Sequence, residues 1–108
     1  MSGTVVDVTD TNFEAKVVKA AGPVLAVFRA EWSAPCRALD AVLADIAKEY
    51  ANRLTVTRLD IDQSPKTPPT YNVNAIPTLY VFKGGKIVAT RIGPAGKNDV
   101  AQLVKPHI

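Results

Sequence analysis

The stretch PVLAVFRAEWSAPCRALDAVLADIAKEY, residues 23–50, decides the fold. Its first part, residues 24–28, is a continuous apolar run between a glycine and an arginine, which is typical of a strand covered on both faces. Over residues 35–50 the apolar side chains recur at helical spacing, and five alanines between 38 and 51 raise the helix propensity. We therefore expect a central strand followed closely by the longest helix.

The segments on either side of this unit carry one helix pattern and one strand pattern. In residues 9–20, Thr11 precedes Glu14 by three positions, the spacing of a capping box, and the segment is predicted to be a helix. Residues 54–59 alternate with a period of two, which indicates a strand. Helix, strand, helix and strand thus follow one another along the first half of the chain.

Two further helices are expected in the second half. Residues 62–73 are rich in proline and threonine, and Ser64 as a cap with Pro65 at the first helical position predicts a short helix. Residues 98–105 form the last helical pattern, which Pro106 should end.

Between them lies a hairpin pattern. The apolar segments 76–82 and 86–92 flank Gly84 and Gly85, which can adopt the positive φ that a tight turn needs. Strands that alternate with helices require parallel pairs covered by helices. We predict an α/β fold in which a central mixed sheet, parallel in its N-terminal part with an antiparallel C-terminal hairpin, is flanked by helices in one domain, residues 1–108.

The composition is that of an ordinary globular protein. The 108 residues are 47% hydrophobic and 21% charged, and no apolar run approaches the ~18 residues that a membrane span needs. The N-terminus lacks the pattern of a secretory signal, so a soluble cytoplasmic protein is expected. The net charge is +3, but basic residues are scattered singly, which argues against nucleic-acid and membrane partners. We expect a monomer without metal, nucleotide or flavin cofactors.

Several separate segments resemble the thioredoxin family in the same order and spacing, over essentially the whole chain. They are AEWSAPC at 30–36, LDIDQSP at 59–65, AIPTLYVFKGGK at 75–86 and RIG at 91–93. The resemblance implies the thioredoxin fold. It also implies that AEWSAPC stands where the family carries Trp-Cys-Gly-Pro-Cys, between the central strand and the long helix.

The redox motif is degenerate: Trp32, Ser33, Ala34, Pro35 and Cys36 take its five places. In the family the first cysteine attacks a substrate disulfide and the second resolves the mixed disulfide. Here a serine takes the attacking place, and a hydroxyl cannot form a disulfide. With one cysteine in the chain, dithiol exchange is excluded. The serine is better read as a helix-start residue than as a hydrolytic nucleophile, because the only histidine lies in the C-terminal tail.

Two positions of the family's proton relay also differ. By the resemblance, Val27 stands in place of a buried aspartate that assists proton transfer, and Arg58 in place of its lysine partner. Losing a buried carboxylate should raise stability while the relay is lost. We expect the Arg58 guanidinium to reach water or another acceptor. In addition, Ala41 replaces a kinking proline in the long helix, and Arg29 replaces an aromatic residue before the motif.

The family's peptide-binding features are retained. Ile76 and Pro77 match its cis-proline loop, and Gly93 matches the glycine that lets a bound chain approach. With Trp32 these residues form a candidate groove for extended peptides. The alternative is that the cis proline only sets the chain path and the tryptophan covers the core.

The pattern favours a redox-inactive protein with the thioredoxin fold that is not an enzyme. Its residues suggest a stability-optimised or computationally redesigned scaffold, that is, a designed or de novo protein. The alternatives are a natural, non-catalytic peptide-binding module, a monothiol enzyme that uses Cys36 with glutathione, or an active thioredoxin with its nucleophile removed. We expect the Cys36 thiol to be buried and inert, with no catalytic residue present.

Overall fold

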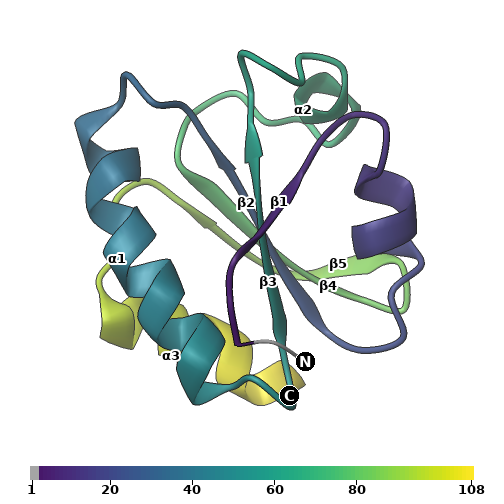
Figure 1. Cartoon of the computed structure of the whole chain (residues 1–108), viewed down its shortest axis with the longest axis vertical. Coiled ribbons are helices and arrows are strands. Elements are labelled where there is room, and N and C mark those ends of the chain that lie inside the picture. Colours follow the sequence, from purple (N-terminus) through teal and green to yellow (C-terminus); the bar gives the residue numbers. More distant parts are fainter. Residues whose placement is uncertain (1–2) are drawn as a thin grey trace.

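The computed structural model describes residues 3–108, so the first two residues of the predicted domain lie outside it. A five-stranded mixed sheet forms the centre of the molecule, in the order β1-β3-β2-β4-β5 (Figure 1). The strands β1, β3 and β2 are parallel, and β2, β4 and β5 are antiparallel. Their bounds are β1 Val6–Val8, β2 Val24–Arg29, β3 Thr55–Asp60, β4 Thr78–Lys83 and β5 Lys86–Ile92. The predicted fold class is confirmed.

Helices cover both faces of this sheet. In Figure 1, α1 and α3 lie on one side, and the short helix η1 with α2 lies on the other. One apolar core lies under α1 and α3, and the other lies under η1 and the loop that follows α2. The helical bounds are η1 Glu14–Val18, α1 Ala34–Glu49, α2 Thr67–Thr70, α3 Lys97–Val104 and η2 Lys105–His107.

The central strand β2 serves both cores, as its continuous apolar run predicted. Side chains alternate across a strand, so Leu25 and Val27 belong to the core under α1 and α3. Ala26 and Phe28 belong to the core under η1. All six residues of β2 are buried, and the strand's C-terminal end delivers the chain to the start of α1.

The N-terminal helix is shorter than predicted and is not capped by Thr11. It is a single π-helical stretch, η1, with Phe13 at the N-cap and no side-chain cap. Instead, the Asn12 Oδ1 accepts a hydrogen bond from the Thr9 backbone N–H at 2.7 Å. This local bond turns the chain before the helix begins, so the capping-box prediction is wrong.

The short helix α2 also begins later than predicted. Neither Ser64 nor Pro65 starts it, since the N-cap is Lys66. Two prolines lie inside the helix because backbone N–H groups in a first helical turn have no intrahelical partner. The start of α2 is held from a distance: Asp10 accepts hydrogen bonds from the backbone N–H groups of Lys66 at 3.1 Å and Thr67 at 2.8 Å.

The hairpin and the last helix agree with prediction. Gly84 and Gly85 have φ values of 61° and 79°, as a two-residue hairpin turn with two positive φ angles requires. The last α-helix ends at Val104, and Pro106 lies in the short 3-10 helix that follows. The hairpin places β5 at the edge of the sheet, opposite β1.

Replacing Asp10 tests its role as the remote cap of α2. Burial acts to raise the pKa of Asp10, but hydrogen bonds from the Thr67 side chain and from the backbone of Lys66 and Thr67 outweigh it, so the pKa lies below 3.8. A lowered carboxyl pKa stabilises the fold above the unfolded pKa, and this is lost as the pH falls. Asp10→Ala should lower the free energy of unfolding by about 1 kcal/mol at neutral pH. Urea unfolding should show the difference shrinking below pH ~3.8; a difference independent of pH would contradict this.

Candidate functional site

The serine of the motif caps the long helix, as predicted. Ser33 is the N-cap of α1, and its Oγ accepts a hydrogen bond from the Cys36 backbone N–H at 3.4 Å. Ala34 and Pro35 follow as the first two helical residues and are exposed. The serine is itself buried, with 7% of its surface exposed. The hydroxyl therefore stabilises the helix start at the place where the family carries its attacking sulfur.

The sulfur of the chain lies directly behind this cap. Cys36 is the third residue of α1, one turn after the N-cap, and is fully buried. Its predicted burial is confirmed. The N-terminal turn of a helix favours negative charge, so the position suits a thiolate once solvent or substrate can reach it.

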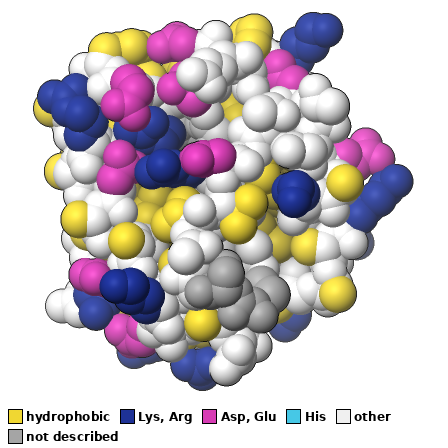
Figure 2. Space-filling view, viewed as in Figure 1, with side chains coloured by type: hydrophobic (Ala, Val, Ile, Leu, Met, Phe, Trp, Pro, Cys, Tyr) yellow, Lys and Arg dark blue, Asp and Glu magenta, His cyan; other side chains and the backbone are white. Residues whose placement is uncertain are grey.

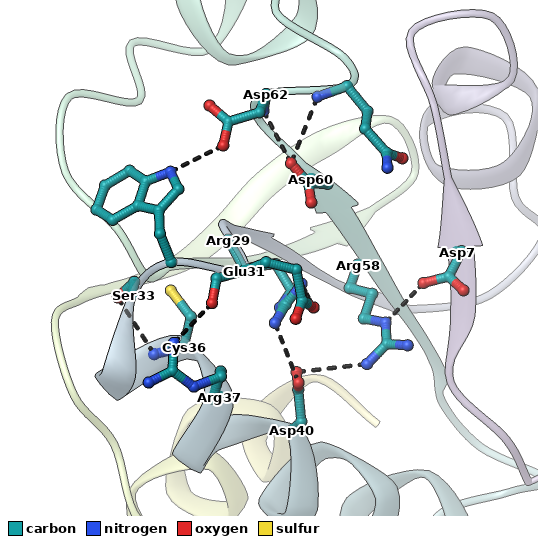
Figure 3. A network of polar contacts seen from close by, with 12 residues as sticks. Asp7, Arg29, Glu31, Ser33, Cys36, Arg37, Asp40, Arg58, Asp60 and Asp62 are labelled. Atoms are coloured by element: carbon teal, nitrogen blue, oxygen red, sulfur yellow. Dashed lines mark hydrogen bonds and ion pairs between the residues drawn. The ribbon is translucent and has the colours of Figure 1, made fainter.

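Trp32 is held open at the surface. Its side chain is 66% exposed, and its Nε1–H donates a hydrogen bond to Asp62 Oδ2 at 2.8 Å (Figure 3). This bond joins the loop before α1 to the turn after β3. The indole is therefore held at the surface and does not cover the core, contrary to the alternative interpretation that the tryptophan is a core residue.

The indole lines an apolar groove of about 190 Å³. Of the predicted groove residues, Trp32 and Ile76 lie in its lining. Sequence reasoning missed the others, which come from the end of β3, α2 and the loop before β4, since no local pattern tells which loops meet in space. They are Ile61, Pro68, Val73, Asn74 and Ala75.

Pro77 follows the groove residue Ile76 and is bonded to Gly93, but neither Pro77 nor Gly93 lies in the groove lining. The Ile76–Pro77 peptide bond is cis, and the Gly93 backbone N–H donates to the Pro77 carbonyl at 2.8 Å. Gly93 has a φ of 100°, and a Cβ at this position would meet nothing within 4 Å. Glycine is thus required by the backbone conformation, and open space lies above it. All four predicted groove residues stand around one end of the sheet.

A network of charged groups lies under the first turns of α1 (Figure 3). Asp40 receives Arg29 Nη2 at 3.1 Å and Arg58 Nη1 at 3.3 Å. Arg58 also donates to Asp7 at 2.6 Å, and Arg29 also meets Glu31 at 3.0 Å. We refer to these five residues as the charge network. Figure 2 shows acidic and basic side chains lying side by side over this part of the molecule.

The charge network was not predicted as a unit. The prediction that Arg58 would find another acceptor is confirmed, and its pKa is raised, chiefly by the hydrogen bond to Asp7. Asp40 was missed, because an acidic residue on a helix reads as a solvated surface charge. No local spacing signals its pairing with Arg29 and Arg58, because these come from two strands of the sheet.

Val27 lies on the same face of the sheet as this network. It is 1% exposed and is paired in register with Arg58 on β3. Residues two apart on a strand share a face, so Arg29 follows Val27 toward α1. Position 27 thus holds a valine and not a carboxylate. The Asp40 carboxylate reaches Arg58, the strand neighbour of Val27, from the helix.

A family model described as Thioredoxin matches residues 4–106. The chain belongs to the thioredoxin family. It is 44% identical to the thioredoxin of Pseudomonas aeruginosa and 46% identical to that of Acidithiobacillus ferridurans, over 108 residues and the full length of both chains in each case. It is 40% identical to the thioredoxin of Allochromatium vinosum over 103 residues, which cover 95% of this chain and 96% of that one.

These relatives overturn the predicted function. They are bacterial thioredoxins that match along the whole chain, and thioredoxins are disulfide oxidoreductases. The predictions of a redox-inactive, stability-optimised or redesigned scaffold, of a non-catalytic module and of a chain that is not an enzyme are therefore wrong. The exchange of one thiol for Ser33 was too little to establish a loss of activity, because Cys36 keeps a sulfur in the first turn of α1.

Restoring the family's carboxylate at position 27 should weaken this fold. Val27→Asp buries a carboxylate beside Arg58, whose donors already serve Asp7 and Asp40, and we expect a loss of about 2 kcal/mol in the free energy of unfolding at neutral pH. Burial raises the pKa of such a carboxyl, so stability should fall as the pH rises above ~4.

Val27→Asn is the matched control, because it adds a polar group of the same size without charge. Its stability loss should not change between pH 4 and pH 7, and denaturant unfolding at both values measures the difference. An aspartate variant with the pH profile of the asparagine variant would show that the carboxyl is not buried in its neutral form.

Proposed function

We propose that this thioredoxin exchanges disulfides in extended polypeptides, with Cys36 as its reacting sulfur and a low-molecular-weight thiol as the second. The placement of the groove carries the proposal: Trp32 lines it one residue before the cap of the helix that holds Cys36. A cytoplasmic location forms part of the proposal, because that compartment keeps small thiols reduced. The protein acts as a monomer on its polypeptide partner.

The substrate segment binds in an extended conformation. The backbone of Ile76 pairs with it, in the manner of a strand added to a sheet. Trp32 forms one wall, and the open space over Gly93 admits the backbone of the bound chain. One apolar side chain of the substrate fills the groove between the indole and Ile76.

The exchange conserves sulfur and electrons. The Cys36 thiolate attacks one sulfur of the substrate disulfide, the sulfur–sulfur bond breaks, and the other substrate sulfur leaves as a thiolate. A low-molecular-weight thiolate then attacks the substrate-derived sulfur of the mixed disulfide. This forms a substrate–small-thiol disulfide and releases the Cys36 thiolate. No second cysteine of this chain is needed.

Burial of the sulfur makes an opening step necessary. Cys36 is fully buried behind Ser33, so the first turn of α1 must open before the sulfur can react. The first turn of a helix whose only side-chain cap is a bond of 3.4 Å lies at the low-stability end of a fold. Opening of this turn therefore limits the exchange rate.

Turnover of a glutathionylated peptide by reduced glutathione tests the proposal. The peptide is extended, with an apolar residue beside the modified cysteine. With this substrate the Cys36 thiolate attacks the glutathione sulfur, the peptide leaves as its free thiolate, and reduced glutathione then attacks the same sulfur to give oxidised glutathione and free Cys36. The wild-type protein should therefore release the free peptide faster than the uncatalysed background, and Cys36→Ala should return the rate to that background. Equal rates for wild type and Cys36→Ala would overturn the proposal.

Restoring the missing thiol should convert the protein to dithiol chemistry. Ser33 and Cys36 are the N-cap and the third residue of one helix, the relation that the family's two cysteines have. In Ser33→Cys the resolving attack is intramolecular, so reduction of a protein disulfide such as that of insulin should rise by about 100-fold or more over wild type. The double variant Ser33→Cys with Cys36→Ala is the control and should lose the gain. A Ser33→Cys protein that forms no internal disulfide would contradict this.

A further inference from the structure

The short helix α2 and the loop that follows it supply most of the groove lining. Pro68 lies inside α2, and the Val73 backbone N–H donates a hydrogen bond to its carbonyl at 3.0 Å. The loop is thus bonded to the helix, and its residues line the groove together with Pro68. They are Val73, Asn74, Ala75 and Ile76. The position of α2 therefore determines the position of this wall.

The helix α2 cannot hold its own position. It is four residues long, and two of the four are prolines, which have no backbone N–H to donate. Helices this short are not stable by themselves. A hollow of about 230 Å³ between η1 and α2 is lined by residues of both elements, so close packing does not fill the space beside the helix. Bonds from other parts of the chain are needed to fix α2.

Asp10 holds the start of α2. Besides the backbone N–H groups of Lys66 and Thr67, its carboxylate accepts a hydrogen bond from the Thr67 hydroxyl at 2.6 Å. Its own backbone N–H donates to the Ser64 Oγ at 3.1 Å. These four hydrogen bonds join the turn after β1 to the residues that begin the helix.

Tyr80 holds the end of α2. Its hydroxyl donates a hydrogen bond to the carbonyl of Tyr71, the C-cap of the helix, at 2.7 Å. Tyr80 belongs to β4 and is buried, and its ring contacts those of Phe28 and Phe82 edge-on. The hydroxyl is therefore carried by a ring that the core fixes, and it ties the end of α2 to the sheet.

We propose that Asp10 and Tyr80 are positioning residues, which hold α2 from its two ends in the place where the groove accepts an extended polypeptide. Neither residue lines the groove. They act through α2: when either bond is lost the helix shifts, and a smaller fraction of the molecules is competent to bind. The inference rests on the proposed function for its substrate class, but its test needs no reaction at Cys36.

Two variants remove these bonds and keep the size of the side chain. Asp10→Asn replaces one carboxylate oxygen by an NH2 group, which cannot accept a hydrogen bond, and Tyr80→Phe removes only the hydroxyl. Each should raise the dissociation constant of an extended peptide about five-fold. The double variant should raise it further, because both ends of α2 are then released.

Thr57→Val is the matched control. The Thr57 hydroxyl is also buried and also donates to a backbone carbonyl, that of Leu25 at 3.1 Å, but this bond lies between β3 and β2. The control therefore loses a bond of the same kind as Tyr80→Phe at a place away from α2. Its dissociation constant for the peptide should equal that of wild type.

Calorimetric titration measures the affinity, with a peptide in which serine replaces the modified cysteine so that no reaction can occur. Turnover of the glutathionylated peptide gives a second readout. KM should rise in Asp10→Asn and Tyr80→Phe while kcat stays at the wild-type value, as expected when only ground-state binding is lost. A merely structural role would leave this ratio as it is in Thr57→Val.

Weaker binding in Asp10→Asn and Tyr80→Phe, with wild-type binding in Thr57→Val, supports the inference. Unchanged affinity in either variant, an equal loss in Thr57→Val, or no peptide binding by the wild-type protein overturns it. Circular dichroism confirms that each variant is folded, and if Asp10→Asn unfolds, Tyr80→Phe decides the question, because it keeps the packing of the ring. If these affinities are as expected but Cys36→Ala releases the glutathionylated peptide as fast as wild type, the proposed function is wrong and the roles of Asp10 and Tyr80 stand.

Discussion

The burial of β2 on both faces is the constraint on which the rest of the structure depends. Its six residues are all buried, so each face of the sheet needs its own cover of helices. On one face α1 and α3 supply it, and on the other η1 and the loops around α2 do. The chain reaches the surface where this buried strand ends. Trp32 and Ser33 lie in the turn from β2 into α1, and Cys36 lies in the first turn of α1.

The same constraint explains why charge collects at this point. Residues at odd positions of β2 face α1, and at the strand end this alternation brings Arg29 rather than another apolar side chain to the helix. A nearly buried guanidinium must be paired, because desolvation of an isolated charge is costly. Asp40 and Glu31 both form ion pairs with Arg29, and Asp40 also pairs with Arg58. Packing at the end of one strand thus brings an ionic cluster to the first turns of α1.

The fold followed from the sequence wherever a pattern was local and repeated. The apolar run of β2, the period of α1 and the two glycines of the hairpin were sufficient for their elements, and Ser33 was identified as a helix-start residue. The starts of η1 and α2 were not, because bonds from Asn12 and from the distant Asp10 decide them. The residues of the site likewise fall into those that the sequence predicted and those that only the structure shows. Trp32, Ile76, Pro77 and Gly93 came from the family resemblance. The other groove residues, which come from the turn after β3, α2 and the loop before β4, and the pairing of Asp40 depend on the tertiary structure.

The Trp32 indole, held by its hydrogen bond to Asp62, is also an intrinsic fluorescent probe. This indole is the only tryptophan of the chain, it is 66% exposed, and its ring forms a wall of the groove. Its fluorescence is therefore a signal from one known place. A ligand that covers the ring removes water from it and shifts the emission to shorter wavelength, whereas loss of the bond to Asp62 frees the ring and lowers the anisotropy. Occupancy of the groove and release of the loop before α1 can thus be followed separately, in the unmodified protein.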